Sequence, residues 1–195
     1  MKKEHELKLS SAHIDPPFKN AQEALIFAFN FSHQQYPRSP MSRAIFQSKG
    51  GRGLGGLEGA AQAGMIKQEV SLLKPIESNY IIARYEPIGS RVWVKAMGGL
   101  SVHVRNNVLP RCQTTTSMRM DYIMRFLPYC RHISINELAK KHAISEKTAV
   151  NHIKEVKKLF RGSAVNNNRH AGLEERAMTA IADRLEKAGI TGENE

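Results

Sequence analysis

The sequence predicts an all-α protein with an N-terminal helical unit, a C-terminal helix-turn-helix domain and a terminal helix. Three observations predict this fold. Apolar residues recur mostly at helical spacing, helix-capping pairs precede several of these runs, and glycine or proline ends them. A chain of 195 residues, 41% of them hydrophobic and 24% charged, is typical of a globular protein with one medium or two small domains.

The net charge of +11 indicates an anionic partner, with nucleic acid ahead of a membrane surface. The excess is densest in residues 111–161, which carry eleven Lys and Arg against four acidic residues. The longest strongly apolar run, 24–29, is far shorter than the roughly 20 residues of a membrane span. Only Cys112 and Cys130 occur, which favours reduced thiols and a cytoplasmic protein.

Residues 1–56 are predicted to form a helix and a basic flexible arm. Asn20 and Glu23 have capping-box spacing before the apolar run 24–31, which predicts a short helix. Residues 36–56 are rich in Pro, Ser, Gly and Arg, as in a mobile loop. This arm offers three cations to DNA phosphates or to a protein partner: Arg43, Lys49 and Arg52.

Half of the fourteen glycines lie in Gly50 to Gly64, where Gly51, Gly53 and Gly56 match G-x-G-x-x-G. A dinucleotide site needs a strand before this motif and a parallel sheet around it, but 42–49 is a poor strand. A Walker lysine is also missing. The stretch is therefore interpreted as a hinge and helix entry, and no cofactor is predicted.

The next predicted unit is 57–105. A helix is expected over 57–73 and another after Pro75, ended by Pro87. Residues 91–104 are ambiguous, because Val and Trp favour a strand and Gly98 with Gly99 would interrupt a helix; a helix followed by a turn is preferred. Residues 106–117 are predicted to be a linker and the domain boundary.

The predicted DNA-binding domain is 118–161. A helix is expected near 118–129, and Ser134 with Glu137 makes a capping box for a second helix from Ile135. Ala139 allows close crossing, and Ser145 is an N-cap for a third helix from Glu146. This arrangement predicts a helix-turn-helix, with Ala143 where glycine is common in the turn. The alternative is a helical hairpin whose charges only solvate it.

The third helix is predicted to enter the major groove, with an apolar face that includes Ala149, Val150, Ile153, Val156 and Phe160. Its hydrogen-bonding side chains suit base edges, and the remaining cations suit phosphates. The predicted base readers are Lys147, Thr148, Asn151 and His152. The predicted phosphate contacts are Arg131, Lys140, Lys141, Lys154, Lys157, Lys158 and Arg161.

Residues 162–195 are predicted to form a polar linker, GSAVNNNRH, and a helix from Leu173 to Ala188 that ends at Gly189. Its apolar stripe either packs on the chain's own core or pairs with a second copy. A homodimer is therefore left open.

The segment Ile133 to Phe160 resembles the helix-turn-helix of sigma factor region 4 and of phage regulators built like it. The wider order of segments, from AHIDPPFKNAQEALIFAFNFS to LEERAMTAIADRLEKAGITG, looks like small regulators of temperate phages, including late-gene antitermination proteins of the Q type. That resemblance implies binding at a late promoter and loading onto host RNA polymerase, which then reads through terminators. Some such regulators carry cysteine pairs, but EPIGSRVWVKAM has no cysteine, so a metal site is not expected there.

Neither a metal site nor an enzyme active site is predicted. His132, His142 and His152 fall before the motif, in its turn and on its reading face, so they should not converge on zinc. The carboxylate pairs Glu69 with Glu77 and Asp121 with Glu137 lack a surrounding pocket pattern. The alternative function is DNA recognition in a packaging or recombination machine, such as a small-terminase-like subunit, which should form a ring.

Overall fold

The computed structural model describes residues 16–34, 56–130, 133–165 and 168–192, and these ranges confirm the all-α prediction. Most of these residues lie in helices, and the sheet that they contain is a two-stranded hairpin. The predicted arm cations Arg43, Lys49 and Arg52 lie outside the described residues, as does Arg131.

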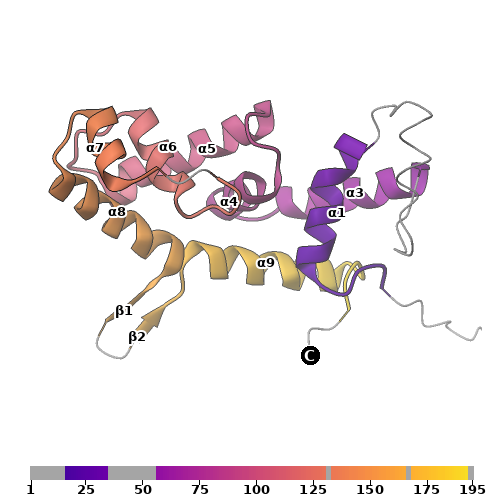
Figure 1. Ribbon diagram of the computed structural model, residues 1–195. Helices are drawn as coiled ribbons and strands as arrows, with labels where there is room; N and C mark the ends of the chain where they lie inside the picture. Colours follow the sequence, from indigo (N-terminus) through magenta and orange to yellow (C-terminus); the bar gives the residue numbers. More distant parts are fainter. Residues whose placement is uncertain (1–15, 35–55, 131–132, 166–167, 193–195) are drawn as a thin grey trace, which may run out of the picture.

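The helices and strands follow the chain in a simple order (Figure 1). They are α1 Ala21–Gln34, α3 Gly56–Ser71, α4 Pro75–Tyr85, α5 Arg91–His103, the π-helix η1 Val104–Val108, α6 Thr116–Met124, α7 Ile135–His142, α8 Glu146–Arg161, β1 Ser163–Val165, β2 Asn168–His170 and α9 Leu173–Lys187. Figure 1 shows α6, α7 and α8 together at one end, α1 and α3 at the other, and α9 running between the two ends.

Helix α9 connects the helix-turn-helix end with the N-terminal helices. It packs against α8 as well as α1, α3 and α4. Its stripe of Leu173, Ala177, Ile181 and Leu185 has no exposed surface, and Gly189, with φ of +66°, follows the helix as predicted. The stripe therefore packs on the chain's own core, and it is not available to pair with a second copy.

Buried residues on both sides of the predicted boundary at 106–117 belong to one continuous hydrophobic cluster. Helix α5 continues into η1 as far as Val108, and the following Leu109 is buried. The supposed linker is thus partly helical and contributes to the core. The division into units at 56, 105 and 161 stays a prediction.

Helix α5 corrects the expectation that Gly98 and Gly99 interrupt a helix, because it runs through both residues. A Cβ atom added at Gly99 would lie 2.2 Å from Nδ2 of Asn79 on α4. The glycine therefore lets α5 approach α4 closely, and this packing offsets the cost of about 1 kcal/mol that glycine adds within a helix. The indole of Trp93 also donates to the carbonyl of Ala83, at 3.1 Å.

Two further predicted elements were wrong in extent or type. Helix α6 ends at Met124, five residues before the expected end at Tyr129. The segment predicted as a polar linker forms the antiparallel hairpin β1–β2, in which Ser163 pairs with His170.

No helix within the described ranges is long and apolar enough to cross a membrane.

Candidate nucleic-acid interface

Helix α7 begins at the predicted capping box. The backbone N–H of Glu137 donates to Oγ of Ser134 at 3.2 Å, and the backbone N–H of Ser134 donates to Oε2 of Glu137 at 2.8 Å. Leu138 and Ala139 are the buried residues of this helix. The small side chain of Ala139 suits the close packing of α7 on α8.

The turn between α7 and α8 has a left-handed residue at Ala143, the position at which glycine is common in this motif. Ala143 has φ of 51° and ψ of 43°, and its side chain is exposed. The following N–H, that of Ile144, donates to the carbonyl of Ala139 at 3.0 Å. The Ile144 side chain packs against the core and fixes the turn.

Replacing Ala143 by glycine is expected to raise the free energy of unfolding by up to about 1 kcal/mol. Left-handed backbone costs an L-residue roughly 1 to 2 kcal/mol, of which the greater unfolded-state entropy of glycine cancels a part. Urea unfolding followed by circular dichroism measures the change. Ala60, exposed within α3, is the control, because Ala60→Gly should cost about 1 kcal/mol. A loss of stability in both variants would contradict the prediction.

Helix α8 starts at Ser145, whose Oγ accepts from the backbone N–H of Thr148 at 3.1 Å. Its buried side is defined by Ala149, Val156 and Phe160. The opposite side is exposed and carries four lysines, an amide and an isopropyl group. We call this the α8 face, and it consists of Lys147, Val150, Asn151, Lys154, Lys157 and Lys158.

The α8 face combines the chemistry of phosphate and base recognition. Lys147, Lys154 and Lys157 form no ion pair with any described residue, so their ammonium groups are available to an anion. Asn151 projects from the same side, and an exposed asparagine can bond both edge atoms of adenine. The α8 face thus offers an amide suited to bases beside ammonium groups suited to phosphates.

The structure turns His152 away from the other predicted base readers. Each residue advances about 100° around a helix, so His152 lies about 140° from Lys147 and turns toward α6. Its Nδ1 shares a hydrogen bond of 3.1 Å with the hydroxyl of Tyr122, and the two rings meet edge to face. Desolvation lowers the pKa of His152 below its usual value, and burial raises the pKa of Tyr122 to about 12. The imidazole therefore packs against Tyr122 of α6 and does not project from the α8 face.

Val150 was predicted to face the core but lies on the exposed side of α8. It was assigned to the apolar face, but 44% of its surface is exposed. Because Ala149, its neighbour, points at the core, Val150 is rotated about 100° away from it. That rotation could have identified it from the sequence. Its methyl groups suit contact with a thymine methyl.

Thr148 is half-buried, and its hydroxyl lies 2.8 Å from Oγ of Ser145. The hydroxyl thus belongs to the cap of α8. Contact of the Thr148 methyl with a thymine stays a prediction.

The predicted phosphate contacts divide into free and engaged cations. Lys140, Lys154 and Lys157 are exposed and form no ion pair with described residues. Lys158 lies 2.7 Å from Glu155 in an exposed pair, which water screens strongly. Arg161 is bound to Glu174 of α9, which also binds Arg84. Arg161 is therefore held against α9.

A buried carboxylate of α6 holds the end of α7. Oδ2 of Asp121 lies 2.6 Å from Nε2 of His142 and 2.7 Å from Nζ of Lys141. Only 5% of the Asp121 side chain is exposed. This group is therefore structural, and the ammonium group of Lys141 is less available to an anionic partner than its sequence position suggested.

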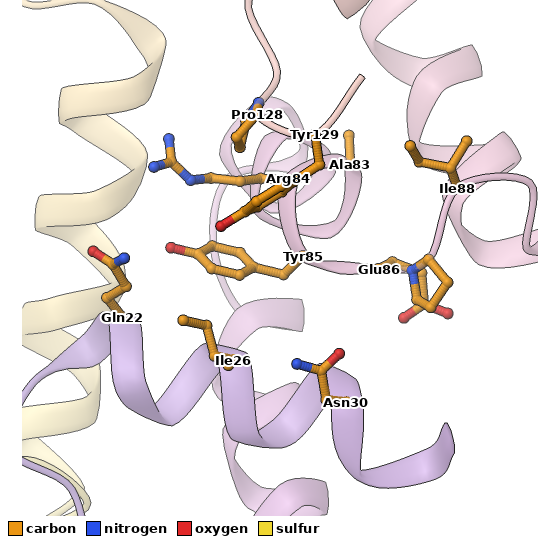
Figure 2. Close-up of a pocket in the computed structure, with 11 residues that line it drawn as sticks. Gln22, Ile26, Asn30, Ala83, Arg84, Tyr85, Glu86, Ile88, Pro128 and Tyr129 are labelled. Atoms are coloured by element: carbon orange, nitrogen blue, oxygen red, sulfur yellow. The ribbon is translucent and has the colours of Figure 1, made fainter. Parts of the chain in front are cut away.

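A separate surface pocket lies between α1, the α4–α5 turn and the residues after α6, and has a volume of about 470 Å³. Figure 2 shows the hydroxyl ends of Tyr85 and Tyr129 pointing to the same side near Arg84. Glu174 already compensates Arg84, and Glu86 adds a carboxylate to the wall. The pocket therefore does not suit a phosphate. Within the described ranges, no three His, Cys, Asp or Glu residues come together to hold a metal ion.

Comparison with known proteins gives no family assignment, because no protein-family model and no curated protein matches the chain. The resemblance to phage regulators accordingly stays a prediction.

Proposed function

We propose that this protein is a sequence-specific regulator that binds double-stranded DNA, with α8 in the major groove. The observation that carries this proposal is the α8 face, on which exposed lysines surround Asn151 and Val150. The major groove is wide enough to admit a helix, and its base edges offer the acceptors, donors and methyl groups that these side chains match.

The roles follow from the chemistry of each side chain. Lys147 suits guanine O6 and N7, Asn151 suits adenine N6 and N7, and Val150 suits the thymine methyl. Lys154 and Lys157 suit phosphates, which position the helix without reading sequence. Relative to the four predicted readers, Val150 is added, His152 is omitted, and Thr148 is kept only through its methyl group, because its hydroxyl belongs to the cap of α8.

Selection of bound duplexes from a random pool with the purified chain tests the proposal. A recovered consensus of a few base pairs, bound at least a hundredfold more tightly than scrambled DNA, would support it. Retention without a consensus would reduce the function to non-specific binding. Sedimentation of the same sample would detect a stable ring in solution. Such a ring would favour the packaging alternative.

Lys157→Ala is expected to weaken binding to all duplexes alike and to lower the salt slope by about one unit. The reason is that Lys157 is an exposed cation without an ion pair among the described residues. Titrations of a specific and a random duplex between about 50 and 200 mM salt measure it. The control is Lys95→Ala, an exposed lysine on α5, which should leave the slope unchanged. Equal salt slopes for wild type and Lys157→Ala would show that Lys157 does not contact a phosphate.

We further propose host RNA polymerase as the protein partner and the bacterial cytoplasm as the place of action. This part rests on the resemblance to late-gene regulators. Transcription through a terminator, with purified polymerase and a template carrying the selected site, tests it. Readthrough that needs both the protein and its site would support antitermination. Site-dependent change of initiation alone would favour an activator or repressor.

A further inference from the structure

The β1–β2 hairpin is a projection that the proposed function does not yet use. It follows α8 directly and extends away from the helices (Figure 1). Its three residue pairs join Ser163 to His170, Ala164 to Arg169 and Val165 to Asn168. Strands of three residues reach about 10 Å, which is enough to extend a protein surface past the end of the helix that bears it.

The base of the hairpin is fixed to α8 by two glycines. Gly162 caps α8 with φ of 79°, and an added Cβ would lie 2.2 Å from the carbonyl oxygen of His170. A Cβ at Gly172 would lie 2.2 Å from the carbonyl oxygen of Phe160. Backbone therefore packs directly on backbone where the hairpin leaves and returns. Such contact sets the direction of the hairpin relative to the last turn of α8.

The charge of the hairpin matches that of the α8 face. The sequence 163–170 contains Arg169 and His170 and no acidic residue. Both side chains are exposed, and the guanidinium of Arg169 lies 2.9 Å from Glu175, with side-chain exposures of 79% and 48%. An ion pair so exposed stabilises a protein by only about 0 to 1 kcal/mol. Arg169 can therefore exchange Glu175 for a phosphate at little cost.

We propose that the hairpin is a second DNA contact, in which Arg169 binds the phosphate backbone that flanks the bases read by α8. This inference rests on the proposed function and adds an interaction surface to it. Along the chain, Lys154, Lys157 and Lys158 lie between the N-terminal turn of α8 and the hairpin, so exposed cations recur from α8 into the hairpin. A guanidinium also suits phosphate oxygens, because its N–H groups can bind two of them at once.

The test compares two duplexes that share the selected site. One ends at the last base of the consensus, and the other extends by about one helical turn on each side. Arg169→Ala is expected to weaken binding to the long duplex roughly fivefold to tenfold at about 0.1 M salt, since one phosphate contact changes the salt slope by about 0.9. Binding to the short duplex should not change. Arg169→Lys, which keeps the charge, should recover most of the loss.

Arg91→Ala is the matched control, because Arg91 is an exposed arginine at the start of α5. It should leave binding to both duplexes unchanged. Equal affinity of Arg169→Ala and wild type for the long duplex would overturn the hairpin contact while leaving recognition by α8 intact. Equal losses on both duplexes, or a similar loss in Arg91→Ala, would also overturn it. A wild-type chain that selects no consensus would instead overturn the proposed function.

Discussion

Replacing Phe160 by alanine is expected to lower the free energy of unfolding by about 3 to 5 kcal/mol. Only 1% of Phe160 is exposed. Its ring stacks on Phe126, with centroids 5.5 Å apart and planes 13° apart, and it meets Tyr80 at 5.9 Å. Removal of the ring would leave a cavity between the C-terminal half of α8, α4 and the residues after α6.

Urea unfolding monitored by far-ultraviolet circular dichroism measures this loss. Val150→Ala is the control on the same helix, because its exposed side chain should contribute less than about 0.5 kcal/mol. If the free energy of unfolding of Phe160→Ala were within about 1 kcal/mol of the wild-type value, this aromatic cluster would not anchor α8. Should the variant fail to fold, Phe160→Leu would give a smaller and measurable loss.

Asn151→Ala is expected to cost about 1 to 3 kcal/mol on the selected site and to remove the preference for one base pair. The exposed Asn151 amide lies among uncompensated lysines on the α8 face. It can satisfy both edge atoms of adenine, and alanine can satisfy neither. Affinities for four duplexes, which differ only at the read position, measure the effect. Binding to random DNA should change little.

His152→Ala provides the decisive comparison. Because His152 is bonded to Tyr122, its loss should reduce stability and leave base preference unchanged. A relaxed base preference in His152→Ala would restore the original sequence assignment. Equal losses for Asn151→Ala on specific and random duplexes would move Asn151 from the bases to a non-specific role.

The helix-turn-helix could be predicted from local sequence because its determinants are local. Ser134 and Glu137 bond each other across three residues, and Ser145 bonds Thr148 across the same interval. Such caps depend little on the rest of the fold. Each cap is formed by residues three positions apart, so the start of α7 and the start of α8 were both predicted correctly.

The features that could not be predicted depend on distant partners. Gly99 lies within a helix because the side chain of Asn79 occupies the position that a Cβ atom would take. The residues near Gly99 in sequence do not predict this contact. The hairpin brings Gly162 close to the carbonyl oxygen of His170. The asparagine-rich sequence between them did not predict this contact. The angle of His152 around α8 follows from the sequence, but its hydrogen bond to Tyr122, thirty residues away, depends on how α6 packs against α8.

The packing of α9 also bears on the order in which the chain becomes functional during synthesis. Leu173, Ala177, Ile181 and Leu185 fill a core shared by α8 and the N-terminal helices. A nascent chain that has emerged only as far as α8 would still expose the apolar surfaces that α9 covers. The newly made chain should therefore reach its folded form only after α9 has left the ribosome, and chaperones would have their longest access to it before that moment.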